Sequence, residues 1–326
     1  MSDVALAVIA IGRNEGDRLL RCLASVLGRA AVVIYVDSAS TDGSAQAARG
    51  MGVDVVQLDM ARPFTAARAR NEGFARAQGL LPDLQFVQFV DGDCEVQPGW
   101  FGAALGFLKT HPHVAVVCGR RRERVPDFSI YNLLCDIEWD TPIGRTKACG
   151  GDAIFRADAL RSVGGYRNSL IAGEEPELCV RLRAAGWEVW RLAEEMTLHD
   201  AAMTRFSQWW KRMVRAGYAY AEGAYLHGAP PERHWVRETR SIVFWSMLLP
   251  MGVAVAWLAW DAHALAVLMA YPAQAVRQFV LARGPWHHRI VRAVSVVLAN
   301  FALGVGHVKF WMQRLTRSSG RLIEYK

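Results

Sequence analysis

Short apolar runs alternate with amphipathic stretches over the first 120 residues of the chain. Four runs have the length and the Val and Ile content of buried strands, namely residues 4–11, 32–36, 53–58 and 86–90. Between them, residues 15–27 place their leucines at helical spacing, a turn rich in capping residues precedes a predicted helix over 45–51, and a third helix is predicted over 66–78. Such alternation is typical of parallel βαβ units. We therefore expect an α/β fold with a mostly parallel sheet flanked by helices.

The pattern changes twice further along the chain. Between residues 100 and 230 it loosens to an α+β pattern, with helices predicted at 100–109, 177–185 and 205–226 and a strand at 114–119. After Pro231 the chain becomes strongly apolar. Residues 242–260 are 19 uncharged residues, about the length that crosses a hydrocarbon core, whereas the uncharged runs 262–276 and 293–308 are shorter. We expect one domain over residues 1–230 and a hydrophobic helical region over 231–326.

The charge of the chain is concentrated in this last region. The formal net charge is +7, but residues 1–230 hold 26 basic and 27 acidic side chains, whereas residues 231–326 hold 12 basic and 4 acidic ones. Basic and apolar side chains together, with tryptophans such as Trp257 and Trp260, indicate a membrane surface rather than a nucleic-acid partner.

The positions of the basic residues suggest how this region meets the membrane. Positive charges flank each apolar run, the last of them at Arg314, Arg317, Arg321 and Lys326. The positive-inside rule then predicts association with the cytoplasmic face through residues 242–312. In that arrangement residues 242–276 form a helical hairpin and 293–308 a re-entrant or interfacial helix. The alternative is a helical subdomain that buries its apolar faces against the rest of the protein or a second subunit.

The six cysteines all precede residue 180 and include no C-x-x-C pair. We interpret them as reduced core thiols in a reducing compartment. Acidic Asp3, rather than a basic segment, precedes the first apolar strand, so we expect no cleavable signal peptide.

Acidic residues follow the fourth predicted strand directly. Asp91-Gly92-Asp93 places two carboxylates on a turn, and the carboxyl ends of the strands are where an open α/β sheet binds its ligands. Two such carboxylates can hold a divalent cation that also binds phosphate oxygens. The same pattern also occurs in ordinary surface turns.

Four further features carry candidate chemistry. Glu174, Glu175 and Glu177 are crowded carboxylates, whose repulsion suits a general base, although acidic residues also favour the N-terminus of a helix. His199 can complete a metal site or serve a structural role. Trp139 can stack on an acceptor sugar or belong to the core. The run Arg120-Arg121-Arg122-Glu123-Arg124 suits a lipid diphosphate or membrane surface, or a solvated loop.

These pieces occur in the order found in one family. The segments are 8–15, Val36-Asp37-Ser38-Ala39-Ser40-Thr41-Asp42-Gly43-Ser44, Ala69-Arg70-Asn71-Glu72-Gly73, Asp91-Gly92-Asp93, Gly150-Gly151-Asp152, Gly164-Gly165-Tyr166, Glu174-Glu175-Pro176-Glu177-Leu178 and His199-Asp200. Over residues 4–225 the chain resembles the family 2 glycosyltransferases, inverting enzymes with the Rossmann-like GT-A fold. The resemblance implies a nucleotide-sugar half over about residues 1–110 and an acceptor half over about 111–230.

The resemblance also implies roles for individual residues. Glu175 would be the catalytic base, with Glu174 as its rival, and the metal ligands would be Asp91, Asp93 and His199. Donor-binding residues would be Arg13, Asn14, Glu15, Asp37, Arg70, Asp91, Arg205 and Arg212. Acceptor-binding residues would be Trp139, Gly151, Asp152 and Trp209. The cofactor would be Mg²⁺ or Mn²⁺, and the donor a nucleotide-diphosphate sugar, by default a UDP-sugar.

Three positions depart from the family's motifs. Ser38 replaces the second aspartate of the base-binding turn, Glu175 replaces the aspartate of an E-D pair, and the Q-x-x-R-W helix is imperfect around Gln208. We expect a non-processive transfer of one sugar to a lipid-linked or cell-envelope glycan, with membrane lipids and no nucleic acid as partners. The sequence leaves the oligomeric state open. Alternatives are a sugar-phosphate nucleotidyltransferase and a non-catalytic membrane-bound nucleotide-sugar-binding protein.

Overall fold

The computed structural model describes residues 4–259 and 261–316. Trp260, Arg317, Arg321 and Lys326, which entered the membrane prediction, lie outside these ranges. The chain forms two compact units. The first is Met1–Pro126 with Cys135–Ala202, and the second is Asp127–Leu134 with Met203–Lys326.

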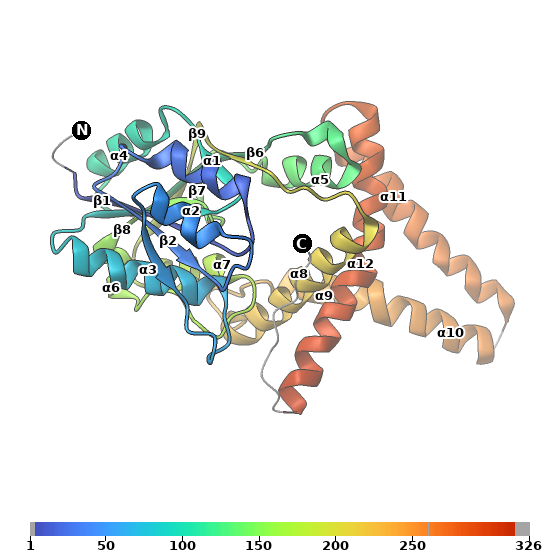
Figure 1. Ribbon diagram of the computed structural model, residues 1–326. Coiled ribbons are helices and arrows are strands. Elements are labelled where there is room, and N and C mark those ends of the chain that lie inside the picture. The colour runs from blue at the N-terminus through green and yellow to red at the C-terminus, as the bar shows by residue number, and fades with distance from the viewer. Residues whose placement is uncertain (1–3, 260, 317–326) are drawn as a thin grey trace. The chain divides into compact units, whose positions relative to one another are not determined.

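The first unit is built on the predicted parallel strands. They are β1 (Leu6–Gly12), β2 (Val32–Asp37), β3 (Asp54–Gln57) and β4 (Phe86–Asp91). These strands pair in parallel in the order β3-β2-β1-β4. The helices of this part are α1 (Asp17–Val26), α2 (Ser44–Gly50), α3 (Ala66–Leu80) and α4 (Trp100–Thr110), and they flank the sheet (Figure 1). The predicted fold class is confirmed here, because continuous apolar runs form strands that are buried on both faces.

The rest of the sheet is mixed. It contains β5 (Cys94–Val96), β6 (Val114–Glu123), β7 (Gly144–Thr146), β8 (Ala153–Arg156) and β9 (Glu188–His199). Strand β8 lies antiparallel between β4 and β6, and β9 pairs in parallel with β6 and antiparallel with β5 and β7. Strand β6 continues four residues beyond its predicted end at 119, because 120–123 pair with 195–199 of β9. The charged run therefore lies on a strand and is not a solvated loop.

The remaining helices before residue 200 are the 3₁₀ turn η1 (Pro126–Phe128), α5 (Ile130–Trp139), which is divided between the two units, and α6 (Ala157–Ser162) and α7 (Glu174–Ala184) of the first unit. Helix α7 begins three residues before its predicted start at 177. Glu174 and Glu175 therefore lie in its first turn, where the helix dipole favours carboxylates. All six cysteines, each within the described ranges, are free and buried, which confirms the prediction of core thiols.

Two glycines, Gly73 and Gly165, allow close packing around α3. A Cβ on Gly73 would lie 2.4 Å from Ile9 Cγ2, so α3 approaches β1 more closely than any other residue type would allow. The Asn71 amide accepts a hydrogen bond from Tyr166 N (2.9 Å) and donates to Tyr166 O (2.7 Å). Gly165 has a φ of +70°, and a Cβ there would meet Asn71 Oδ1 at 2.6 Å. Asn71 and the Gly-Gly-Tyr loop therefore fit as a pair.

The second unit is helical. It contains α8 (Phe206–His227), α9 (Val236–Val243), the π-helical segment η2 (Phe244–Leu248), α10 (Leu249–Ala259), the 3₁₀ segment η3 (Ala262–Met269), α11 (Ala270–Leu281) and α12 (Trp286–Leu315). Helices α8 and α12 pack with backbones in close approach. A Cβ on Gly217 would lie 2.0 Å from Leu303 O, and one on Gly306 would lie 2.0 Å from Val214 O.

Three helical stretches of the described chain are long and apolar enough to cross a membrane: Val236–Ala259, Ala262–Leu281 and Trp286–Leu315. Asp261, between the first two stretches, lies within the predicted hairpin 242–276 and is outside any helix. The uncharged runs 262–276 and 293–308 lie within helical stretches of 20 and 30 residues, which are longer than the runs themselves; whether they span or lie at the interface stays a prediction. Many large apolar side chains on these helices are exposed, for example Leu258 (79%), Met269 (67%) and Leu315 (81%).

Candidate active site

Asp91, the last residue of β4, is held by two guanidinium groups. Arg70 Nη2 lies 2.9 Å from Asp91 Oδ1, and Arg121 Nη2 lies 3.1 Å from Asp91 Oδ2. Asp152 Oδ1 accepts a hydrogen bond from the Asp91 backbone N–H at 3.0 Å. The side chain remains 30% exposed. Both carboxylate oxygens of Asp91 are therefore neutralised by arginine in this structure.

Arg70 connects this aspartate with the acidic end of α7. Its guanidinium is buried and contacts Glu174 Oε1 at 2.9 Å and Glu175 Oε1 at 3.0 Å, in addition to Asp91. The guanidinium lies over the ring of Tyr166, with its carbon 5.5 Å from the ring centroid. Arg70 is thus the shared counter-ion of three carboxylates from two elements, an arrangement that fixes their relative positions.

The three glutamates of the first turn of α7 have different surroundings. Glu177 is buried and ion-paired with Arg181 (2.8 Å) and Arg167 (3.2 Å), which indicates a structural role. Glu174 is also buried, whereas the side chain of Glu175 is 13% exposed. Burial, and then the charge of Glu174, raise the pKa of Glu175 to about 7, against the opposing effect of Arg70. Glu175 is therefore suited to accept a proton near neutral pH.

Gly151 lies against this cluster. A Cβ on Gly151 would be 2.6 Å from Arg70 Nη2 and 2.8 Å from Asp91 Oδ2. A side chain at this position would push the arginine and the aspartate apart. The Gly-Gly-Asp segment is consequently close to Asp91, a predicted donor and metal residue, and its last residue, Asp152, is buried and hydrogen-bonded to the Asp91 backbone.

Arg121 is a site residue that the sequence did not single out. Its Nε and Nη2 lie 2.9 and 2.7 Å from Asp152 Oδ2, which also accepts a hydrogen bond from Thr197 Oγ1 at 2.6 Å. The Arg121 guanidinium carbon lies 5.3 Å from the centroid of the Trp139 ring. Trp139 also packs edge-on against His199, with ring centroids 4.7 Å apart. Trp139 therefore borders the candidate site.

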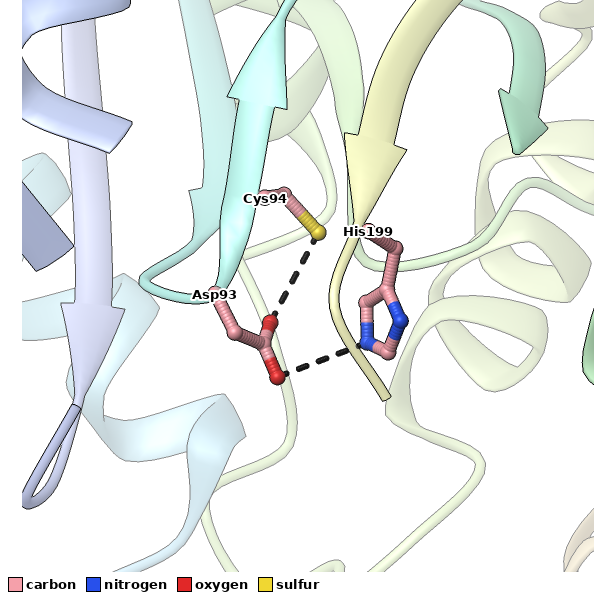
Figure 2. A group of neighbouring side chains, drawn as sticks. All are labelled: Asp93, Cys94 and His199. Carbon is pink, nitrogen blue, oxygen red and sulfur yellow. Dashed lines mark hydrogen bonds and ion pairs between the residues drawn. The ribbon is translucent and has the colours of Figure 1, made fainter. Parts of the chain in front are cut away.

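Asp93, in the turn between β4 and β5, faces His199, the last residue of the neighbouring strand β9. In Figure 2 the Asp93 carboxylate contacts the Cys94 sulfur with one oxygen and the His199 ring with the other. The distance from Asp93 Oδ2 to His199 Nε2 is 3.4 Å. Both side chains are buried. A carboxylate oxygen and an imidazole nitrogen at this separation fit a divalent cation such as Mn²⁺, so the residues present are compatible with the metal that the fold family implies. Among the described residues, Asp93, Cys94 and His199 bring their ligand atoms within 4.8 Å of one another.

Cys94 contributes a hydrogen bond to this group. Its Sγ donates to Asp93 Oδ1 at 3.6 Å. Burial, and then the charge of Asp152, raise the pKa of the Cys94 thiol well above its usual range. The protonated thiol therefore orients the Asp93 carboxylate.

The two turns expected to hold the nucleotide are bound to each other. Asn14, which has a φ of +56°, donates its backbone N–H to Ser40 Oγ (2.9 Å), and its side chain accepts from Thr41 N (2.7 Å). The buried Asp37 carboxylate accepts hydrogen bonds from Tyr35 Oη (3.0 Å) and Ser40 N (3.1 Å). The predicted donor residues Asn14 and Asp37 are thus brought together at the carboxyl ends of β1 and β2.

Two more predicted donor residues flank this turn. The Arg13 guanidinium carbon lies 5.0 Å from the centroid of Phe64, and Glu15 pairs with Arg18 at 2.8 Å. Their contacts with a donor stay predictions.

The predicted site residues on α8 belong to the second unit. Arg205 precedes α8, whose N-terminus is capped by Gln208, because Gln208 Oε1 accepts from Arg205 N at 3.0 Å. Trp209 is buried and packs near Phe206, with ring centroids 5.6 Å apart. Arg212 lies on the same helix. Their proposed roles in donor or acceptor binding stay predictions.

Part of the chain matches a known family, and several known proteins are similar to it. Residues 7–159 match the model of the family described as glycosyl transferase family 2. The chain is 25% identical over 245 residues to the pre-mycofactocin glycosyltransferase of Mycobacterium tuberculosis, a match that covers 68% of this chain and 48% of that protein. It is 23% identical to the glycosyltransferase AglE of Haloferax volcanii, covering 65% of this chain and 71% of that one. The chain thus spans about half the length of its mycobacterial relative.

Solved structures confirm the fold. The mannosyltransferase PcManGT from Pyrobaculum calidifontis, in complex with GDP-Man and Mn²⁺, superposes with a TM-score of 0.61 at 20% identity, over 93% of this chain and 87% of that one. The glucosyl-3-phosphoglycerate synthase of Mycobacterium tuberculosis, in complex with Mn²⁺ and UDP-glucose, superposes with a TM-score of 0.51 at 18% identity. The match covers 70% of this chain and 81% of that one. Residues 7–159 thus match the glycosyl transferase family 2 model, the similar curated proteins are glycosyltransferases, and the solved structures share the fold of this chain.

Proposed function

We propose that this chain is an inverting, metal-dependent glycosyltransferase that moves one sugar from a nucleotide-diphosphate sugar, by default a UDP-sugar, to a lipid-linked or cell-envelope glycan. The observation that carries the proposal is the Arg70 cluster. One guanidinium nitrogen, Nη2, contacts both Asp91 and Glu175, so the candidate base is held next to the sheet edge where the donor is expected.

Glu175 acts as the general base. Its carboxylate takes the proton of an acceptor hydroxyl while the hydroxyl oxygen attacks the anomeric carbon from the face opposite the diphosphate. The new C–O bond forms as the bond to the diphosphate oxygen breaks, and the configuration at the anomeric carbon inverts. The pKa of Glu175 near 7 supports this role, since a useful fraction is ionised at neutral pH.

Asp93 and His199 would hold the divalent cation, Mg²⁺ or Mn²⁺, and the bound cation would neutralise charge on the departing diphosphate. Asp91 has both oxygens held by Arg70 and Arg121, which favours a role in orienting the donor over a role as a direct ligand. Asn14 and Asp37 are proposed to bind the nucleoside, and Trp139, Gly151 and Asp152 to border the acceptor.

We propose further that the enzyme acts at a membrane, on its cytoplasmic face. The support is the exposure of large apolar side chains along three helices that have the length of membrane spans, together with the surplus of basic residues in this part of the chain. An acceptor carried by a lipid would be confined to the same surface.

The first test is donor binding. The full chain in detergent is titrated with Mn²⁺ and a panel of nucleotide-diphosphate sugars, and the unfolding temperature is followed, because a ligand that binds the native state raises it. We expect a metal-dependent rise with one donor, its loss in Asp93→Asn, and its retention in Glu175→Gln. If a folded chain responds to none of the donors with metal present, the proposed function is wrong.

A further inference from the structure

Glu123 is a buried carboxylate directly behind the candidate metal histidine. It is the last residue of β6, it is opposite His199 in the parallel pairing with β9, and it is 3% exposed. Its Oε2 lies 3.2 Å from His199 Nδ1. Its two oxygens also accept the backbone N–H of Ala201, at 3.3 and 3.2 Å. The carboxylate is therefore held both by His199 and by the backbone two residues beyond it.

The other ring nitrogen of His199 faces the other carboxylate. Nε2 lies 3.4 Å from Asp93 Oδ2, and Trp139 packs edge-on against the ring. A neutral imidazole carries one N–H, and the nitrogen without it is an acceptor. When Nδ1–H donates to Glu123, Nε2 presents its lone pair towards an oxygen of Asp93. Two facing acceptors repel each other unless a cation lies between them, so this tautomer matches the proposed metal site.

We infer that Glu123 is a positioning residue: it accepts the Nδ1–H of His199, fixes the tautomer and orientation of the ring, and directs Nε2 with Asp93 towards a divalent cation. This inference rests on the proposed function. Metal-bound histidines generally donate their second N–H to a carboxylate or a carbonyl, and loss of that partner weakens metal affinity about 10- to 100-fold. Glu123 occupies that position here.

The test measures the binding of Mn²⁺ alone to the full chain in detergent, by the loss of the electron paramagnetic resonance signal of free Mn²⁺. The variants are Glu123→Gln and Glu123→Ala, with Asp93→Asn as the variant that removes a proposed ligand. Glu177→Gln is the matched control, because Glu177 is as deeply buried and is paired with Arg181 and Arg167 rather than with His199. The unfolding temperature of every variant is recorded in the absence of metal.

We expect the Kd for Mn²⁺ to rise about 10-fold in Glu123→Gln and up to about 100-fold in Glu123→Ala, and to stay unchanged in Glu177→Gln. Unchanged affinity in a folded Glu123→Gln variant would overturn the inference and leave the metal-dependent function standing. If the folded wild-type chain does not bind Mn²⁺, the proposed metal chemistry fails, and the inference fails with it.

A second measurement needs no substitution at Glu123. Nitrogen-15 NMR of the metal-free, histidine-labelled chain reports which ring nitrogen carries the proton, and His199→Gln identifies the resonance. Because Nε2 and Asp93 repel each other without a cation between them, the spectrum is recorded with saturating diamagnetic Mg²⁺ as well, and there we expect the Nδ1–H tautomer for His199. A predominant Nε2–H tautomer with Mg²⁺ present would refute the proposed role even if the Glu123 variants do not fold.

Discussion

Arg70 Nη2 lies 3.0 Å from Glu175 Oε1, in a cluster where the guanidinium is fully buried and the carboxylate almost so. The contact joins the start of α3 to the start of α7, two segments more than one hundred residues apart in the chain. It places a cation beside a carboxylate whose pKa is nevertheless raised to about 7, because burial and Glu174 outweigh the attraction of Arg70. The balance between these three effects sets the pH at which Glu175 can act as a base.

The first prediction concerns the pH dependence of the reaction. A general base works only when ionised, so kcat/KM should rise with pH and level off above about 7, the pKa of Glu175. Initial rates at subsaturating donor, from pH 5.5 to 8.5, measure this profile. A rate that is flat or that falls with pH across the range would speak against Glu175 as the base.

The second prediction concerns stability. Since the pKa of Glu175 is raised from 4.5 to about 7 on folding, the folded chain binds more protons than the unfolded chain between these values. The free energy of unfolding should therefore fall as pH rises through this window. Glu175→Gln removes this contribution, so the variant should be more stable than wild type above pH 7, by on the order of 1–3 kcal/mol, and similar to it near pH 4.

Thermal unfolding of both proteins at pH 4.5 and pH 8 gives the comparison. A variant that is less stable than wild type at pH 8 would contradict the raised pKa.

The third prediction concerns the cation of the cluster. Arg70→Met keeps the volume but leaves Asp91, Glu174 and Glu175 without their shared counter-ion. We therefore expect the free energy of unfolding to fall by about 3–5 kcal/mol. Because Arg70 lowers the pKa of Glu175, we also expect the rise of kcat/KM to move to higher pH. The control is Arg76→Met on the same helix, which breaks an exposed pair with Asp54 and should have little effect. Denaturant unfolding of both variants measures the difference, and equal stability would contradict the account.

The fourth prediction concerns the packing of α3 on the sheet. Gly73→Ala should destabilise the protein by about 1–3 kcal/mol, because its Cβ would lie 2.4 Å from Ile9 Cγ2. Gly79→Ala, six residues along the same helix and with open space around the new Cβ, should instead stabilise it by about 0.5–1 kcal/mol. Denaturant midpoints of the two variants should move in opposite directions; a shift of the same sign would show that α3 does not pack as described.

The fifth prediction concerns the membrane. The full chain should sediment with membranes and remain in the pellet after alkaline carbonate treatment, since the apolar side chains of α10, α11 and α12 are largely exposed. Release into the supernatant without detergent would contradict membrane insertion and favour a helical subdomain that covers its apolar faces with protein.

The parts of the fold that the sequence predicts well are those whose pattern is local. Strands β1, β2 and β4 are continuous apolar runs, and helices α1, α3 and α8 show helical periodicity. Strands β5, β7 and β8 have three or four residues each, too few to show a period, and β9 places charged residues among its apolar ones. Their positions follow from pairing with distant strands, which a single sequence does not display.

The site shows the same division. Asp91, Asp93 and Glu175 are found from motifs, whereas Arg121 and Glu123 lie in a charged run that also fits a solvated loop. Within a strand, alternate residues share a face. The side chains of Arg121 and Glu123 are 15% and 1% exposed, and that of Arg122 between them is 50% exposed, so a period of two was present in the run. That period becomes informative only once β6 is known to continue to residue 123.

The most direct test of the proposed reaction is transfer itself. Membranes that contain the chain are incubated with Mn²⁺ and the radiolabelled nucleotide-sugar that the binding screen selects, and label in the lipid and glycan fractions is counted for wild type and Glu175→Gln at equal amounts of folded protein. We predict incorporation by wild type and a loss of about 10²- to 10⁴-fold in Glu175→Gln with donor binding retained. Equal incorporation by the two proteins would contradict the assignment of Glu175 as the catalytic base.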